Sequence, residues 1–347
     1  HWRLLDMQSN EITAGVVCPL LRLKLHTGVK PKDFRIEIGV KKTMKMIVKN
    51  GMLCTESGVY EADILIENGV IREIGTGLAE HESKLGSADA EIEIVDASGK
   101  YVLPGAVDIH THMDLDVGIA RVIDDFYTGT IAAACGGTTS IVDHMAFGPK
   151  DCSLWHQVRE YHKLADGNAV VDYGFHGVFQ HVNPQVLEEM GEIAKKEGIT
   201  SFKVYMTYGY GLNDKELMQI LTQAKKDGIL IASHCENDGM VNYYREKFVK
   251  EGHTQPRYQP LSRPAETEAE AVNRFLYLAE SAGEAPVYVV HLSSKQGLME
   301  VRRARRRGQK HFGVETCPQY LFLTDDRYAD DQEGLKAIMA PPLRKKE

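Results

Sequence analysis

Hydrophobic and polar positions first form an interpretable pattern at about residue 44, after a stretch with no clear period. From residue 44 onward, short β-type runs occur, several of them closed by Asn-Gly or Gly: Met46–Gly51, Ala62–Gly69, Val70–Gly75, Glu91–Val95 and Lys100–Leu103. Runs of this length and composition, with such endings, predict strands joined by hairpin turns. We therefore expect a small β-sandwich part over residues 44–103.

After the turn at Pro104-Gly105, apolar strands alternate with helical patterns. The expected strands are Val107–His112, Thr138–His144, Val171–Val178, Thr200–Met206, Ile229–His234, Val287–Leu292 and Phe312–Cys317. Strands spaced in this way, with helices between them, indicate βαβ units and a parallel sheet. We predict an α/β fold over residues 104–347, a (β/α)₈ TIM-type barrel truncated before its eighth strand. The active sites of such barrels lie where the strands end.

Composition and charge narrow the possible partners. The chain has 347 residues, a formal net charge of −8 and no dense Lys/Arg face, which argues against nucleic acid or a membrane surface as partner. The basic run Arg302–Arg307 is expected to be a solvated helix face. The cysteines are scattered without paired spacing, which is typical of reduced thiols and predicts a cytoplasmic protein.

The ends of the chain carry two further expectations. Residues 1–43 show no clear period, and this N-terminal extension is left without a function. The chain begins with His1, has no signal-peptide pattern and has no apolar run long enough to cross a membrane. We expect it to be a fragment or a processed form.

The first candidate chemistry is the pair His110 and His112 at the end of an expected strand. Side chains alternate along a strand, so both imidazoles point the same way and can reach one metal ion. The alternative is a pair of histidines satisfied by ordinary hydrogen bonds.

The residues at the other expected strand ends favour a metal site over ordinary hydrogen bonds. They carry ionisable groups that would repel one another unless a cation organised them. These groups include Asp143, His144, His176, Lys203, His234, Glu236 and His291. Lys203 lies in an apolar strand, where burial disfavours its charged form and leaves a free amine. Carbon dioxide could convert that amine into an anion that bridges two metal ions, whereas the alternative is a lysine that reaches solvent.

Several motifs together resemble the D-phenylhydantoinase and dihydropyrimidinase family of cyclic amidohydrolases, over about residues 44 to 347. They are Asp108–His112 after Pro104-Gly105, Asp124–Thr130, Gly136–Thr139, Phe202–Met206, Ser262–Pro264, Glu315–Tyr320 and Pro341–Arg344. The segment Ile141–Pro149 favours the phenylhydantoinase branch of the family.

The resemblance implies a centre of two divalent metal ions, expected to be zinc. It places His110 and His112 on one ion and His234 and His291 on the other, with Lys203 as N6-carboxylysine between them. It further implies that a metal-bridging hydroxide is the nucleophile.

For the substrate, the resemblance implies that Tyr208 hydrogen-bonds the developing oxyanion. It also implies that the backbone at Ala340, where the family usually has serine, contacts the ring amide. The family's last ligand, an aspartate of the eighth strand, would follow Glu347, so we expect residues 1–347 alone to be inactive. His144, His176 and His181 match no ligand of the family and are expected either to support the ligands from behind or to be structural.

The expected substrates are 5-monosubstituted hydantoins, preferably D and aromatic, which would give N-carbamoyl amino acids. Met113 and Asp114 stand where dihydroorotases have an arginine for a carboxylate, so a carboxylated ring would meet no matching charge. A dihydropyrimidinase acting on dihydrouracil and a non-catalytic assembly-forming relative remain the alternatives. The resemblance also implies a homo-oligomer, a dimer or a tetramer.

Overall fold

The computed structural model describes residues 2–6, 15–17, 45–85 and 92–346 of the chain. Two compact units are formed, and each is treated by itself below. The first comprises His1–Asp114, Ile123–Val142 and Ala165–Gly174, and the second comprises the remaining residues. Most of the N-terminal extension, for which no function was predicted, lies outside the described residues. Within it, the strands β1 (Trp2–Asp6) and β2 (Gly15–Val17) are described.

A mixed seven-stranded sheet occupies the first unit. Its order is β2-β1-β7-β3-β4-β5, with β6 also paired to β3. The strands after β2 are β3 (Lys45–Thr55), β4 (Gly58–Glu67), β5 (Val70–Gly75), β6 (Ile92–Asp96) and β7 (Lys100–Pro104). Alternate residues of β3 and β4 bury one apolar face, where Val48, Leu53 and Ile64 pack with Val102. Helix α1 (Leu78–Leu85) packs on β3 and β4, and Leu78 joins Ile47 and Leu65 in a second small core.

The two Asn-Gly pairs of this sheet have different structures. Asn68-Gly69 is the predicted hairpin turn between β4 and β5, with both residues at positive φ (50° and 77°), as a two-residue turn requires. Asn50-Gly51 was also predicted to end a strand, but β3 continues through it with a register shift, as in a β-bulge. Asp63 explains the difference, because its Oδ1 accepts a hydrogen bond from the Asn50 backbone at 2.9 Å and holds the bulge in the sheet.

The seven strands predicted after residue 105 are all present and form one sheet in the order β14-β13-β12-β11-β10-β9-β8. They are β8 (Ala106–Thr111), β9 (Thr138–His144), β10 (Asp172–Val178), β11 (Ser201–Tyr205), β12 (Leu230–His234), β13 (Val287–Val289) and β14 (Phe312–Val314). The pairs from β10 to β14 are parallel. The fold is therefore a parallel half-barrel, a truncated TIM-type barrel that follows a small β domain.

Helices connect the strands, as a parallel sheet requires. They are α2 (Phe126–Cys135), α3 (Leu154–Ala165), α4 (Pro184–Glu197), α5 (Asp214–Asp227), α6 (Asp238–Lys250), α7 (Gln259–Ser262), α8 (Ala265–Ser281), α9 (Lys295–Arg307) and α10 (Pro318–Phe322). Short 3₁₀ turns are η2 (Pro256–Tyr258), η3 (Asp325–Tyr328) and η4 (Glu333–Ala337).

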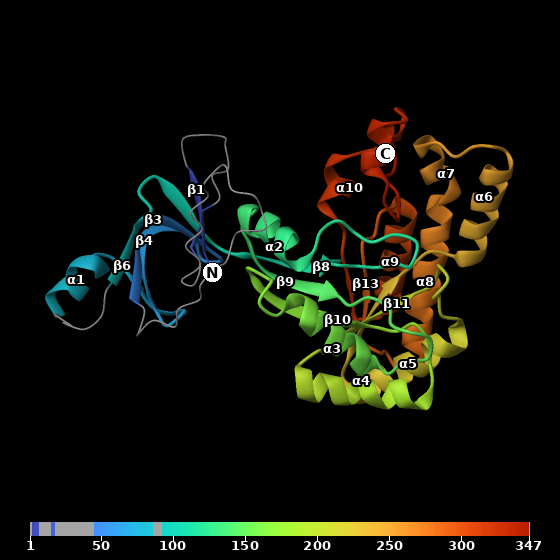
Figure 1. Cartoon of the computed structure of the whole chain (residues 1–347), viewed down its shortest axis with the longest axis horizontal. Helices are drawn as coiled ribbons and strands as arrows, with labels where there is room; N and C mark the ends of the chain where they lie inside the picture. Colours follow the sequence, from blue (N-terminus) through green and yellow to red (C-terminus); the bar gives the residue numbers. More distant parts are fainter. Residues whose placement is uncertain (1, 7–14, 18–44, 86–91, 347) are drawn as a thin grey trace. The chain divides into compact units, whose positions relative to one another are not determined.

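Within the second unit, the helices pack in the order of the chain. Helix α4 lies against α5, α5 against α8 and α8 against α9 (Figure 1). These helices carry completely buried apolar residues, such as Leu217 and Ile220 of α5 and Phe275 of α8. Among the described residues, no helix combines the length and the hydropathy that a membrane crossing needs.

Candidate functional site

The histidine pair of the first unit lies at the end of β8. The rings of His110 and His112 have their centroids 5.3 Å apart, and a ring nitrogen of one lies within 4.8 Å of a ring nitrogen of the other. Both side chains are half-buried. The backbone here is tied locally, because His110 donates its N–H to Asp108 Oδ1 at 3.0 Å. The alternation of the strand therefore brings these two predicted ligands together.

Lys203 lies in the middle of β11 in the second unit and is only 1% exposed. Its neighbours in the strand, Phe202 and Val204, are completely buried. Burial lowers the pKa of Lys203 to about 7, although Glu315 opposes this effect. The Nζ atom lies 5.6 Å from the ring centroid of Tyr205. A neutral amine is therefore accessible near pH 7, as the sequence analysis expected.

His234 and His291 end or follow neighbouring strands, and their ring centroids are 4.6 Å apart. Both are buried. Burial lowers the pKa of His234, although the hydrogen bond to Glu236 opposes it. His291 has a positive φ of 39°, and its backbone N–H donates to Glu315 Oε1 at 3.0 Å. The hydrogen bond to Glu315 thus stabilises an uncommon backbone conformation, and this conformation sets the direction of the His291 side chain.

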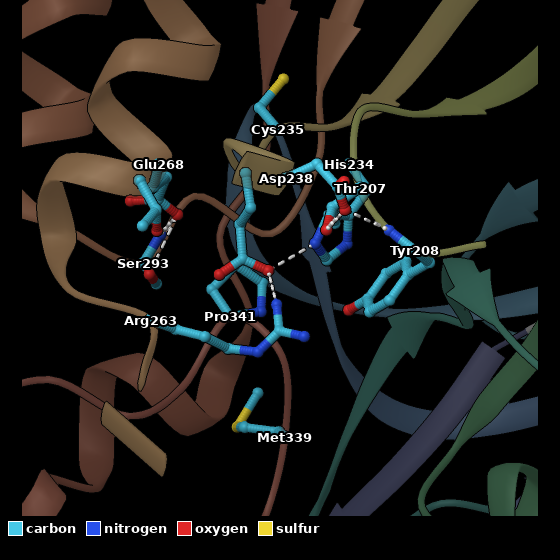
Figure 2. Close-up of polar contacts among 12 residues, drawn as sticks. Thr207, Tyr208, His234, Cys235, Asp238, Arg263, Glu268, Ser293, Met339 and Pro341 are labelled. Atoms are coloured by element: carbon cyan, nitrogen blue, oxygen red, sulfur yellow. Dashed lines mark hydrogen bonds and ion pairs between the residues drawn. The ribbon is translucent and has the colours of Figure 1, made fainter. Parts of the chain in front are cut away.

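Tyr208 follows β11 and is close to His234, with ring centroids 5.1 Å apart (Figure 2). It also has a positive φ, 74°. Asp238, the first residue of α6, holds this turn: its Oδ1 accepts from Thr207 Oγ1 at 2.9 Å and from the Tyr208 N–H at 3.2 Å. Burial raises the pKa of Tyr208, so the phenol stays protonated and remains a hydrogen-bond donor.

Aromatic rings surround Tyr208. Tyr210 lies 5.6 Å from Tyr208 and 3.8 Å from Phe147, measured between ring centroids, and Tyr205 lies 5.0 Å from Tyr210. We call these four residues the aromatic cluster. Such rings offer flat apolar surface to a ligand.

Ala340 lies in the second unit, on the segment after η4, and is half-buried. The backbone on either side of it is fixed from other elements. Gln259 donates to the Met339 carbonyl at 3.0 Å, and the Tyr320 hydroxyl donates to the Pro341 carbonyl at 2.6 Å. The main chain at Ala340 is therefore held in place independently of its own small side chain.

Sequence reasoning gave no role to two residues that contact this site. Glu236 is completely buried, and its Oε2 lies 2.6 Å from His234 Nε2 and accepts a hydrogen bond from Arg263. Arg263 belongs to the Ser-Arg-Pro motif, which had been used only as a mark of resemblance. The available signal was the placement of Glu236 two residues after a predicted ligand. The Arg263 contact crosses 27 positions of sequence, which no local pattern reveals.

His144 and His176, which were expected to be structural, stack on each other with ring centroids 4.5 Å apart. His176 Nδ1 also lies 2.5 Å from Ser201 Oγ at the start of β11. The pair therefore joins β9, β10 and β11.

The donor set fits divalent metal ions. Neutral imidazoles supply lone pairs of the type that zinc and similar ions prefer, and burial favours the neutral form of His234. Lys203 as an ammonium could not serve, but its lowered pKa makes the free amine, and from it a carbamate, accessible. A set of histidines compatible with a metal site is thus present.

Comparison with known proteins matches residues 101–318 to the Amidohydrolase family. A D-phenylhydantoinase from Escherichia coli O1:K1 / APEC is 49% identical over 301 residues, which is 87% of this chain and 63% of that protein. The chain therefore spans less than two thirds of the curated relatives it matches.

Solved structures agree with this similarity. A dihydropyrimidinase from Brevibacillus agri NCHU1002 has a TM-score of 0.80 and 40% identity, and a D-hydantoinase from Bacillus sp. AR9 has a TM-score of 0.80 and 41% identity. In each case the match covers 87% of this chain and 64% of the other.

Proposed function

Because this chain belongs to the Amidohydrolase family, we propose that the protein hydrolyses the cyclic amide bond of 5-substituted hydantoins. The products are N-carbamoyl amino acids, and aromatic D-hydantoins are the preferred substrates. The 49% identity to a protein named D-phenylhydantoinase supports this choice of substrate. The observation that carries the proposal is Lys203, a lysine 1% exposed in the strand that leads to Tyr208.

The proposed metal ligands are His110, His112, Lys203, His234 and His291. Each lies in one of the strands after residue 105 or shortly after one, and barrel enzymes carry their active sites where such strands end. When bound, two divalent ions, which we propose to be zinc, would make hydroxide available near neutral pH and polarise the scissile carbonyl.

Lys203 is proposed to be carboxylated. Its neutral amine forms an N–C bond to carbon dioxide, one C=O electron pair moves to oxygen, and the nitrogen releases a proton, which leaves a carbamate anion. The lowered pKa of Lys203, about 7, supports this step because only the unprotonated amine has the electron pair for it. The anion would supply the negative charge that four neutral imidazoles lack.

Tyr208 is proposed to donate a hydrogen bond to the carbonyl oxygen as the ring opens. Hydroxide adds to the carbonyl carbon, so negative charge grows on the carbonyl oxygen. The C=O bond then re-forms as the ring C–N bond breaks, and the nitrogen takes up the proton that the hydroxide brought. A fixed phenol donor stabilises that charge. The backbone at Ala340 is proposed to contact the ring amide, and its fixed main chain supports this role.

The aromatic cluster favours hydantoins that carry an aromatic 5-substituent. Its rings supply apolar surface beside Tyr208, whereas dihydrouracil has no side chain that would use it. Dihydrouracil remains the second candidate substrate, because a relative of 40% identity is named dihydropyrimidinase. We further propose a cytoplasmic homo-oligomer, a dimer or a tetramer.

The decisive experiment compares turnover of phenylhydantoin, dihydrouracil and allantoin by the protein expressed from its complete coding sequence. We expect phenylhydantoin to be hydrolysed fastest. Faster turnover of dihydrouracil would make the protein a dihydropyrimidinase, and faster turnover of allantoin would overturn the substrate class. Absence of stoichiometric metal together with absence of turnover would favour a non-catalytic assembly protein.

A further inference from the structure

A buried ion pair lies directly behind one of the proposed metal ligands. Glu236 is completely buried, and Arg263 is 8% exposed. The guanidinium of Arg263 donates to Glu236 Oε2, the same oxygen that faces His234 Nε2 at 2.6 Å. Charges removed from water in this way are tolerated only when they are paired and hydrogen-bonded.

The pair determines which nitrogen of His234 carries the proton. A carboxylate next to a guanidinium is ionised and can only accept hydrogen bonds, so Nε2 of His234 must be the donor. The lone pair of the neutral ring is then on Nδ1. A histidine that binds a metal commonly donates its other N–H to a carboxylate, which fixes both the tautomer and the orientation of the ring.

Arg263 also contacts the substrate side of the site. Its guanidinium carbon lies 5.2 Å from the ring centroid of Tyr208, within the range of a cation–π contact. In Figure 2 the Tyr208 hydroxyl points toward Arg263. One guanidinium therefore touches both the carboxylate behind His234 and the ring of the proposed oxyanion donor.

Arg263 is itself held from a distant part of the chain. Its carbonyl accepts a hydrogen bond from Arg344, and Arg344 Nε donates to Ser293 Oγ at 3.1 Å. Ser293 follows His291 by two residues, so this contact ties the Arg263 loop to the segment that carries another proposed ligand.

We propose that Glu236 and Arg263 are positioning residues. Together they orient His234 for metal binding through Nδ1, and Arg263 also holds the ring of Tyr208 in position beside His234. The proposal rests on the proposed function above. It predicts that one ion pair controls two measurable properties, metal affinity and the contribution of Tyr208 to turnover.

The predicted effect on metal affinity is tested with Glu236→Gln and Arg263→Lys in the complete protein. A solvent-accessible Arg–Glu pair, Arg274 with Glu270 at 2.9 Å, provides the matched controls Glu270→Gln and Arg274→Lys. Zinc affinity is measured by competition with a chromogenic chelator, and the absorption bands of cobalt-substituted protein report the ligand geometry. We expect zinc affinity to fall by about 10- to 100-fold in Glu236→Gln and the cobalt bands to shift, with both controls unchanged.

The tyrosine arm is tested by a double-mutant cycle between Arg263→Lys and Tyr208→Phe. If Arg263 positions Tyr208, the double variant loses less kcat at saturating zinc than the product of the two single-variant losses. The reason is that either single change already removes the interaction between the two residues. Independent, multiplicative losses would overturn this arm.

The outcomes separate the inference from the proposed function. A wild-type protein that binds no divalent metal contradicts the proposed function itself. Wild-type metal binding with equal affinity in Glu236→Gln contradicts only the positioning role. If Glu236→Gln fails to fold, Arg263→Lys, which keeps the positive charge, carries the same test. Failure of both to fold, with the controls folded, would assign the pair a purely structural role and also overturn the inference.

Discussion

At the scale of single residues, the site depends on side chains whose ordinary chemistry is altered by burial. Lys203 and His234 are both buried, and burial lowers the pKa of each. Sequence patterns predicted the burial of Lys203, because its strand is apolar. They did not predict Glu236 and Arg263 as partners, because a contact across 27 positions depends on how α7 and its loop return to the end of β12.

Lys203 gives a stability prediction with a definite sign. In metal-free, uncarboxylated protein, its pKa is about 7 when folded and 10.5 as the ordinary value. Between these values the unfolded chain binds one more proton than the folded chain, so the free energy of unfolding rises with pH, by up to about 1.4 kcal/mol per pH unit. Urea titrations at pH 7 and pH 9 measure this rise. In Lys203→Met the increment should be missing, and an identical pH dependence in both proteins would contradict the burial argument.

Tyr208→Phe tests the proposed hydrogen-bond donor. Removing one donor to a developing oxyanion lowers kcat by about 10²- to 10³-fold, while KM changes little because the ground-state carbonyl gains less from the bond. Steady-state kinetics with phenylhydantoin measure both constants. Zinc content serves as the control, since the ring of Phe keeps the packing against His234. A large rise in KM with unchanged kcat would make Tyr208 a binding residue only.

At the scale of elements, the strands were predictable because each is a short apolar run, and β8 to β14 all lie where the sequence placed them. The differences are at the ends: β13 and β14 stop at Val289 and Val314, several residues before the predicted ends. The chain beyond them turns to build the site, as at His291. Asn50-Gly51 was misassigned because the same dipeptide suits a hairpin and a bulge, and Asp63, distant in sequence, decides between them.

The turn Asn68-Gly69 offers a test of this sheet. Gly69 has φ 77°, so Gly69→Ala forces a Cβ into the left-handed region and is expected to lower the free energy of unfolding by about 1–2 kcal/mol. Gly239 in α6 is the matched control, because its φ is not positive and an added Cβ meets only an ordinary contact, 3.5 Å from Asn237 Oδ1. Gly239→Ala should be neutral or stabilising by about 0.5–1 kcal/mol. Equal effects of the two changes in urea titrations would refute the turn assignment.

At the scale of the whole molecule, the fold class follows from the strict alternation of strands and helices, and the parallel half-barrel confirms it. The sequence also suggested the proposed ligands, since histidines recur where strands end. The supports of these ligands could not be predicted, because Glu315, Asp238 and Arg263 act through backbone groups or through other side chains. Such contacts depend on the tertiary fold and produce no periodic pattern in the sequence.

Metal removal should act on the entire protein. Ligands that bind only the folded state stabilise it, so dialysis of the complete protein against a chelator is expected to abolish turnover and lower Tm. Zinc added with bicarbonate should restore both properties, whereas zinc in carbon-dioxide-free buffer should restore them only in part, because Lys203 would stay an amine. Calorimetry and turnover assays follow the two properties. Full recovery without bicarbonate would argue against a carboxylated lysine.

The left-handed backbone at Tyr208 and His291 has a consequence for attempts to make this protein more heat-resistant. A non-glycine residue held in that region costs of order 1–3 kcal/mol of folding free energy. Glycine at either position would relax this strain, but it would also remove a packed ring, the phenol of Tyr208 or the imidazole of His291. A screen for heat-resistant variants must therefore score turnover as well as stability.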